Sequence, residues 1–332
     1  MQVTFNELDF GVEIEFSGIT RHQAAKILVQ YFGTTFVKYG GWNNEEFHIP
    51  DQQGRIFKIV MDGSVDALRR EGNTDVPGTD EYKCEMVTPV LHYSDLPTLL
   101  GTITALKLGG AITGVNCGTH IHIDASLFTS QQLRTLCNLV YRHQYLLTNA
   151  LCIRESRKKK FCADFSEEFI EKLNRVKPES YEEWSEVWYS GYNALEATRY
   201  IRRNDSRYRV INLHNLLSGR FKAVEFRLFN SSLDVVHIKA YIQLCLIITA
   251  QALRQKKAIT RIAITDNDKF TFRVFLLKAG AIGDEFREMR RLLLKHLDGD
   301  SGRRRPNIGN KPVEAICGNG GITNNILLPE EY

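Results

Sequence analysis

Short segments in which polar and apolar residues alternate constrain the fold of this chain more than any other feature of its sequence. They are GVEIEF (Gly11–Phe16), FKIVMDGS (Phe57–Ser64), KCEMVTPV (Lys83–Val90), THIHID (Thr119–Asp124) and AVEFRLF (Ala223–Phe229). Successive side chains of a β-strand point to opposite faces of the sheet, so a period of two predicts strands with one apolar and one polar face.

Helical patterns lie between and after these strands. Helices are expected at Thr20–Phe32, Ser94–Lys107, Ser130–Leu151, Val235–Leu253 and Asp284–His296, and a polar, aromatic helical segment at Asp164–Tyr200. The combination predicts an α+β fold, in which an antiparallel or mixed β-sheet carries the active site on one face and is flanked by helices.

Composition and charge exclude several classes of protein. Apolar residues make up 43% of the 332 residues and charged residues 25%, which are ordinary globular values. No run of about 18 apolar residues occurs, so no transmembrane helix is expected. The sequence MQVTFNELDFGVEIEF at the N-terminus lacks a basic region followed by an apolar stretch, so export is not expected.

The cysteines indicate a reducing compartment. Their number is odd, no CxxC occurs, and the spacing fits no zinc-binding pattern. They lie at Cys84, Cys117, Cys137, Cys152, Cys162, Cys245 and Cys317. We interpret them as reduced thiols that mostly fill the core of a cytoplasmic protein.

A net charge of +4 is too small to indicate a nucleic-acid partner by itself. Basic residues cluster at Arg154–Lys160, Arg199–Arg209 and Arg303–Arg305. The first and third clusters are typical of solvated surface, and the second could meet phosphate. No pattern of interleaved aromatic residues supports a nucleic-acid groove.

The polar residues of the predicted strands form pairs that share a face. Residues at i and i+2 of a strand point the same way, which groups Glu13 with Glu15, His120 with His122, and Glu225 with Arg227. Glu85 lies in a fourth strand, and Asp62 ends a fifth, just before a Gly-Ser turn.

Taken singly, each of these pairs is ordinary, because a polar outer face is normal for an antiparallel sheet. Their occurrence together is what indicates a site. Carboxylates that cluster on one face repel each other unless protons, arginines or metal ions neutralise them. Mg²⁺ or Mn²⁺ would do so, since these cations prefer carboxylate oxygens and tolerate one imidazole.

The same residues allow a second interpretation. His120, His122 and the nearby carboxylates could hold Zn²⁺ in a hydrolase, because His, Asp and Glu also suit zinc. Arg227 beside Glu225 and the basic Arg199–Arg209 segment favour a substrate that carries phosphate instead.

Taken in order, GVEIEF, the Asp-Gly-Ser of KIVMDGS, EMVTPV, CGTHIHID and VEFRLF resemble the putative amidoligase family of the carboxylate–amine ligase superfamily, which includes glutamine synthetase. The resemblance covers about residues 10–232 and implies a glutamine synthetase-like catalytic domain. It also implies ATP-dependent amide or isopeptide formation through an acyl phosphate, with two divalent metal ions, Mg²⁺ or Mn²⁺.

The resemblance also implies roles for individual residues. Glu13, His120 and Glu225 would hold one metal ion. Glu15, Glu85 and Asp62 would hold the other, with Asp80 and Glu81 competing for the place of Asp62. His122 would face nucleotide or substrate, Arg227 would meet the transferred phosphoryl group, and Arg207 or Arg209 would hold the ATP phosphates. The absence of a GxxxxGK[ST] loop is consistent with ATP held on a sheet.

The expected domain division follows from the extent of the motifs. Residues 1–250 would form the catalytic domain, with a helical insertion around 154–200. Residues 251–332 would form a helical extension and a Gly/Asn/Pro-rich arm packed on the same domain. The expected substrates are a small-molecule or peptide carboxylate and amine, without nucleic acid or membrane. A carboxylate or guanidino kinase, and a catalytically silent binding protein, remain alternatives.

Overall fold

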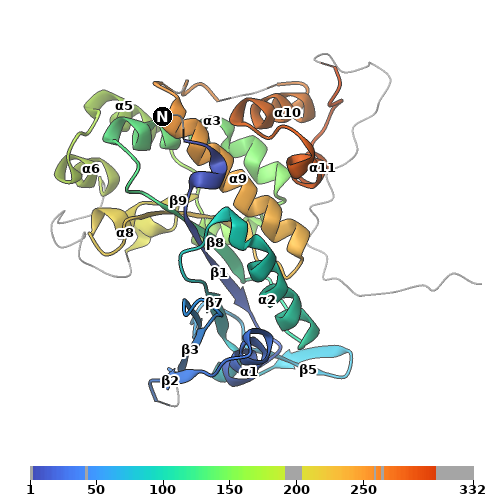
Figure 1. Ribbon diagram of the computed structural model, residues 1–332. Helices are drawn as coiled ribbons and strands as arrows, with labels where there is room; N and C mark the ends of the chain where they lie inside the picture. The colour runs from blue at the N-terminus through green and yellow to red at the C-terminus, as the bar shows by residue number, and fades with distance from the viewer. Residues whose placement is uncertain (1–2, 42–43, 191–203, 258, 263–264, 304–332) are drawn as a thin grey trace, which may run out of the picture.

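An eight-stranded antiparallel sheet forms the centre of the protein (Figure 1). The computed structural model describes residues 3–41, 44–190, 204–257, 259–262 and 265–303. The strand order is β2-β3-β4-β7-β1-β8-β10-β9. The strands are β1 (Phe10–Phe16), β2 (Val37–Tyr39), β3 (Glu46–Pro50), β4 (Ile56–Val60), β7 (Cys84–Val87), β8 (Gly118–Asp124), β9 (Ile211–Asn212) and β10 (Ala223–Asn230). The predicted α+β class is confirmed, and the sheet is antiparallel rather than mixed.

Ten α-helices lie in the rest of the described chain. They are α1 (Arg21–Phe32), α2 (Leu96–Leu108), α3 (Ser130–Ala150), α4 (Glu155–Phe161), α5 (Glu167–Val176), α6 (Tyr181–Trp188), α8 (His214–Leu217), α9 (Val235–Arg254), α10 (Asp268–Ala279) and α11 (Arg287–Leu294). The first of them illustrates how the sequence sets the bounds. The Thr20 hydroxyl accepts a hydrogen bond from the Gln23 N–H, and Gly33 ends α1 at a φ of 67° that few other residues adopt.

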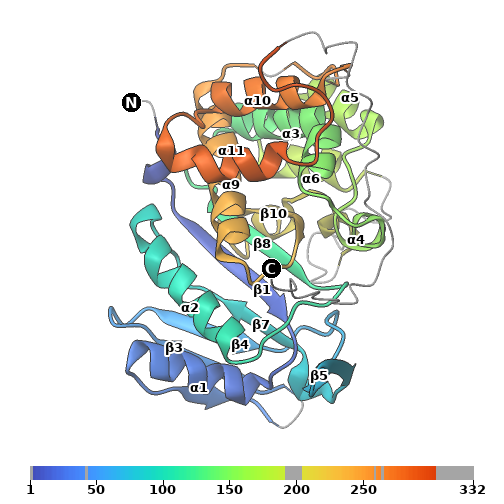
Figure 2. The same cartoon turned by 90° about the vertical axis from the view of Figure 1, so that its right-hand side faces the viewer.

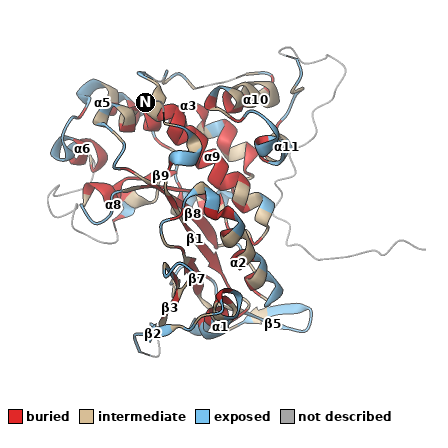
Figure 3. Cartoon of the chain, viewed as in Figure 1, coloured by how far each residue is buried: buried red, intermediate tan, exposed pale blue. Residues whose placement is uncertain are grey.

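The apolar face of the sheet is the one that the alternation predicts. Val12, Ile14 and Phe16 of β1 are at most 1% exposed. Helices α1 and α2 lie over this face, as Figure 2 shows, and α9 packs against both α2 and β8. The centre of the sheet and most of α9 are buried (Figure 3).

Helix α9 is the most apolar element of the fold. Within the described residues it is the one helix long and apolar enough, by length and composition alone, to cross a membrane. Of its most apolar window, 78% is buried inside the protein, against α2, α3, α10 and α11. That degree of burial is typical of a core helix.

Several elements escaped prediction from the sequence. The hairpin of β5 (Leu68–Glu71) and β6 (Thr74–Pro77) is mostly exposed, so it has no apolar face to detect. The sequence also did not indicate β2, β3 or β9, and α10 was expected only as an unspecified part of the helical extension after residue 250. Strand β4 ends at Val60, so the prediction that Asp62 ends this strand was wrong by two residues.

The described cysteines contain no disulfide. Cys84, Cys117, Cys137, Cys162 and Cys245 are buried free thiols, and Cys152 is half-buried. The predicted role as core fillers is therefore confirmed for these five, and Cys317 lies outside the described residues.

The segment after residue 250 contains α10 and α11, which pack against α9. A short 3-10 helix, η5 (Asp284–Phe286), precedes α11, so the helix predicted at Asp284–His296 is present in two pieces. The predicted Gly/Asn/Pro-rich arm falls almost entirely outside the described residues, and a domain division at residue 250 stays a prediction.

Candidate metal centre

The register of four neighbouring strands brings the predicted polar residues face to face. Glu13 of β1 is directly opposite His120 of β8, and Glu15 of β1 is directly opposite Glu85 of β7. Directly paired residues of adjacent strands share a face. On the next strand along, β10, Glu225 is opposite His122 of β8. The face shared by β7, β1, β8 and β10 therefore carries four carboxylates and two imidazoles.

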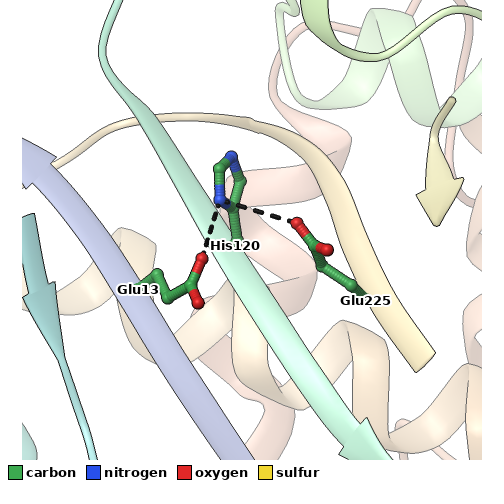
Figure 4. A group of neighbouring side chains, drawn as sticks. All are labelled: Glu13, His120 and Glu225. Atoms are coloured by element: carbon green, nitrogen blue, oxygen red, sulfur yellow. Dashed lines mark hydrogen bonds and ion pairs between the residues drawn. The ribbon is translucent and has the colours of Figure 1, made fainter. Parts of the chain in front are cut away.

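His120 lies at the middle of this cluster. Its Nδ1 atom is 3.2 Å from Glu13 Oε2 and 3.7 Å from Glu225 Oε1. Figure 4 shows Glu13 and Glu225 on either side of this ring, with both contacts as dashed lines. Its Nε2 atom is 3.7 Å from Glu15 Oε1. Two sets of ligand atoms are thus compact enough to hold a metal ion: Glu13 with His120 and Glu225, and Glu15 with Glu85 and His120.

Glu225 is the most tightly held carboxylate of the cluster. The Arg227 guanidinium donates a short charged hydrogen bond to its Oε1 atom, and Asn212 Nδ2 of β9 donates to Oε2 at 2.6 Å. Arg227 Nε also donates to the Phe161 carbonyl at 3.3 Å. Glu225, Arg227 and Asn212 are all buried, so the carboxylate is fixed before any ligand arrives.

A β-bulge shapes β10 at this point. Phe226 pairs with Ile121 of β8, but the next pair along the strand is Phe229 with Thr119, so β10 has one residue more than β8 over this stretch. The Arg227 N–H donates to the carbonyl of Val210, the residue just before β9. The bulge lies between Glu225, which belongs to the cluster, and Phe229, whose ring stacks on Tyr241 of α9.

Glu15 and Glu85, the two carboxylates that face each other across β1 and β7, both have raised pKa values. Burial raises the pKa of Glu15 to about 7, and the negative charge of Asp62 adds to this effect. Burial also raises the pKa of Glu85 well above its usual range, helped by the charges of Glu13 and Glu15. Two carboxylates that face each other in a buried place disfavour each other's ionised form.

Glu13 is in the opposite situation. Its burial would raise its pKa, but the neighbouring His122 and His120 outweigh burial and hold the pKa well below its usual range. Conversely, Glu13 raises the pKa of His122 to about 9 against the effect of burial. Burial and the positive charge of Arg227 lower the pKa of His120 to about 4, which keeps this imidazole neutral and able to act as a ligand.

These properties fit a hard divalent cation. Carboxylate oxygens with a single neutral imidazole are the donors that Mg²⁺ and Mn²⁺ accept, whereas structural zinc sites favour more nitrogen and sulfur. A cation between Glu15 and Glu85 would also relieve their mutual repulsion. The donor chemistry therefore agrees with the predicted metal ligands.

Four members of the cluster, Glu13, Glu15, Glu85 and His120, form the floor of a cavity of about 860 Å³, and the described residues that line it do not include His122 or Glu225. Besides the carboxylates, its walls include Lys58, Arg207, Arg220 and Arg227, and the aromatic rings of Phe161, Tyr208 and Phe221. An acidic floor beneath basic walls suits a cation below and phosphate groups above it. A larger cavity of about 1140 Å³ lies among α3, α5 and α10, but the cluster does not contribute to its walls.

The structure brings together most of the predicted site residues. Glu13, Glu15, Glu85, His120, His122, Glu225 and Arg227 meet on the sheet face. Asp62 and Arg207 line the cavity. The Asp62 carboxylate accepts hydrogen bonds from the Ser64 N–H at 2.6 Å and from its hydroxyl at 2.5 Å, which holds it in the loop after β4. Asp80, a competitor for the same role, instead pairs with Lys83 at 2.8 Å.

Arg209 lies elsewhere. Its guanidinium carbon is 4.5 Å from the centre of the Trp188 ring and 4.7 Å from that of Phe169, so it packs on the aromatic side of α5 and α6. Among the described residues, those that line the cavity do not include it. Its predicted contact with ATP phosphates is therefore not supported by its position.

Arg157 was missed by sequence reasoning. It belongs to the basic Arg154–Lys160 segment that we interpreted as surface, yet it is only 2% exposed. Its Nη2 atom lies 3.3 Å from His120 Nε2 and donates to the Arg227 carbonyl at 3.1 Å. Arg157 and the apolar Phe161 are four positions apart, so they lie on the same side of a helix. This spacing was the available signal that one residue of the basic segment faces inward.

The fold and the site together define an α+β protein whose antiparallel sheet carries a buried carboxylate–histidine cluster suited to divalent cations. The chain belongs to the family described as "Putative amidoligase enzyme", whose model matches residues 6–249. The resemblance seen in the motifs is thereby confirmed. None of the curated proteins matches the chain.

Proposed function

We propose that this protein is an ATP-dependent carboxylate–amine ligase that joins its substrates through an acyl phosphate and uses two Mg²⁺ or Mn²⁺ ions. The observation that carries the proposal is the pair of ligand sets that meet at His120 on the floor of a cavity with arginines in its walls. The family to which the chain belongs supports the ligase activity. A glutamine synthetase-like arrangement of the sheet is part of the same proposal.

Each group of residues has a distinct role in this proposal. Glu13, His120 and Glu225 hold one cation, and Glu15 and Glu85 hold the other, with Asp62 at the cavity wall as a further oxygen donor. Bound cations neutralise the charge on the nucleotide phosphates during transfer.

Arg227 and Arg207 bind phosphoryl oxygens, because both line the cavity and a guanidinium fork matches such oxygens. The Glu225 carboxylate orients the Arg227 fork. The role of His122 toward substrate or nucleotide rests on the resemblance alone, because this residue does not line the cavity and its ring lies 3.2 Å from Glu13 instead.

The reaction then follows two steps. A carboxylate oxygen of the substrate attacks the γ-phosphorus of ATP, the bond to the β,γ-bridging oxygen breaks, and ADP leaves. The amine nitrogen attacks the acyl carbon, phosphate leaves with the bonding pair, and the nitrogen loses a proton to give the amide. The cavity must exclude water between the steps, since an acyl phosphate hydrolyses readily.

Oxygen transfer tests this chemistry directly. With a carboxylate substrate labelled with ¹⁸O, one labelled oxygen is expected in the released inorganic phosphate, because the acyl phosphate loses its bridging oxygen with phosphorus. Substrates can be found by screening carboxylate and amine mixtures for ADP release. Release of a stable phosphorylated product without an amide would assign a kinase instead.

Matched variants test the proposed ligands. Glu13→Gln, His120→Asn and Glu225→Gln are each expected to abolish ADP release while leaving the circular dichroism spectrum unchanged. Asp124→Asn is the control, because Asp124 lies on the same strand as His120 but bonds to the nearby Ser126. Retention of near-normal turnover in all three site variants would refute the assignment.

A zinc hydrolase is the second candidate, which the pair of histidines on β8 favours. Metal analysis of the purified protein separates the two. Stoichiometric, tightly bound zinc in a protein that does not bind Mg²⁺-ATP in calorimetry would favour the hydrolase.

The proposal places the enzyme in the cytoplasm, with small-molecule or peptide substrates and no nucleic-acid or membrane partner. The buried free cysteines support a reducing compartment. Retention of the native protein in the cytosolic fraction on fractionation would test this part.

A further inference from the structure

Arg157 is a charged side chain built into the layer of residues that supports the metal centre. It projects from the short helix α4, which packs against β10. Its guanidinium lies flat on Gly118 at the start of β8, so that a Cβ atom on this glycine would be 2.1 Å from Arg157 Nη2. The absence of a side chain at Gly118 therefore allows a buried arginine to reach the cluster.

The hydrogen bonds of Arg157 determine the state of His120. A guanidinium has only N–H donors. The contact of 3.3 Å from Arg157 Nη2 to His120 Nε2 therefore requires that Nε2 be the unprotonated nitrogen. The proton of a neutral His120 is then on Nδ1, where Glu13 Oε2 at 3.2 Å accepts it.

This arrangement conflicts with cation binding by His120. A neutral imidazole has one nitrogen lone pair available to a metal ion. Arg157 occupies that lone pair on Nε2, the atom nearest to Glu15. A cation bound through Nδ1, beside Glu13 and Glu225, would require the proton to move to Nε2, where it would point at the donors of Arg157.

We propose that Arg157 is a positioning residue that competes with the divalent cation for His120. In the arrangement with Arg157 bonded to Nε2, the ring is oriented and its charge-neutral form is fixed. Cation binding at either ligand set breaks the contact between Arg157 and His120, while the bond from Arg157 to the Arg227 carbonyl can persist. The inference rests on the metal-binding part of the proposed function and is independent of the substrates.

The competition has a measurable size. A hydrogen bond to a charged donor corresponds to about a tenfold change in an equilibrium. Arg157→Met, which keeps most of the apolar stem, is therefore expected to tighten Mn²⁺ binding about tenfold or more, measured by calorimetry on chelator-treated protein. The Mn²⁺ affinity of Arg157→Lys should lie between that of the wild-type protein and that of Arg157→Met.

Lys159→Met is the matched control. It removes the same charge from the same helix, but Lys159 is exposed. A change in Mn²⁺ affinity equal to that of Arg157→Met would show a long-range effect of charge and overturn the proposal, as would weaker binding by Arg157→Met.

A spectroscopic measurement keeps the proposal testable even where Arg157→Met fails to fold. Long-range ¹H–¹⁵N correlation spectra of the wild-type protein distinguish the two neutral forms of a histidine ring, and His120→Gln assigns the signals. We expect Nδ1 protonated in chelator-treated protein and a changed Nε2 signal after MgCl₂ is added. A proton on Nε2 before cation addition would refute the inference.

The result also separates this inference from the proposed function. If the wild-type protein binds neither Mn²⁺ nor Mg²⁺, the metal centre itself is wrong. If it binds them while Arg157→Met and Lys159→Met behave alike, only the role of Arg157 is wrong.

Discussion

At the scale of the residue, the alternation of the strands was sufficient to group Glu13 with Glu15, His120 with His122, and Glu225 with Arg227. The period of two fixes which residues share a face, whatever the partner strands are. The alternation could not show that Glu15 faces Glu85, because it does not show which strands are neighbours or how they are aligned. Nor could it identify Arg157, since a run of basic residues does not indicate which one points inward.

Glu85 illustrates how function and stability oppose each other here. Because it lies directly opposite Glu15 in a buried place, Glu85→Gln removes a repulsion. We expect the free energy of unfolding in EDTA to stay the same or rise by up to about 1 kcal/mol. Mn²⁺ affinity should fall at least about tenfold, because an oxygen ligand with charge is lost.

Urea denaturation with and without chelator measures the first effect, and calorimetry measures the second. Glu168→Gln, which changes an exposed carboxylate of α5 outside the cluster, is the control and should change neither. A marked loss of stability in Glu85→Gln under chelator would contradict the repulsion.

Gly118 and Arg157 should be coupled energetically. An alanine at position 118 would place its methyl group where the guanidinium lies, so Gly118→Ala is expected to cost about 1–3 kcal/mol of unfolding free energy. In Arg157→Ala the same glycine substitution should cost clearly less, since the overlap is gone. A double-mutant cycle measures this, and additive effects would contradict the packing.

At the scale of the element, the prediction succeeded for strands with an apolar face and for long amphipathic helices such as α3 and α9. The prediction failed for elements that do not have one apolar and one polar face, such as the exposed β5–β6 hairpin. The β-bulge in β10 was also not predictable, because AVEFRLF alternates like a regular strand and the additional residue appears only in the pairing with β8. Helix α10 has aromatic residues whose spacing does not give a clear apolar stripe.

The packing of α3 on α10 predicts a dependence of stability on pH. His143 of α3 stacks on Phe275 of α10 with ring centres 3.9 Å apart, and burial lowers its pKa from 6.5 to about 4. Between these values the unfolded chain binds the proton more readily than the folded one. The free energy of unfolding should therefore fall as pH is lowered from 6.5 to about 4, by up to about 3 kcal/mol from this residue.

Comparison with His143→Gln isolates this contribution, because other groups titrate in both proteins. The difference in unfolding free energy between wild type and variant should change over this pH range and be constant above it. A constant difference from pH 4 to pH 8 would contradict the predicted burial.

At the scale of the whole molecule, α9 connects the two sides of the core. It contacts β8 and α2 on one side and α3, α10 and α11 on the other. Ile242→Ala, at a fully buried position of this helix, is expected to cost about 2–5 kcal/mol. Val236→Ala, where the side chain is 37% exposed, should change stability by no more than about 0.5 kcal/mol.

Urea denaturation followed by both fluorescence and circular dichroism tests this role. Because α9 contacts elements from both ends of the described chain, the two signals should shift together in Ile242→Ala. Separate transitions would show that the segment containing α10 and α11 unfolds independently of the sheet.

The order of the central strands has a consequence for synthesis of the protein. Strand β8 pairs with β1 on one side and β10 on the other, so the ligand set of Glu13, His120 and Glu225 joins residues more than two hundred positions apart. A growing chain on the ribosome lacks this ligand set until β10 has emerged from the exit tunnel. A cation can then stabilise only a late stage of folding, and it cannot select among the earlier, shorter nascent chains.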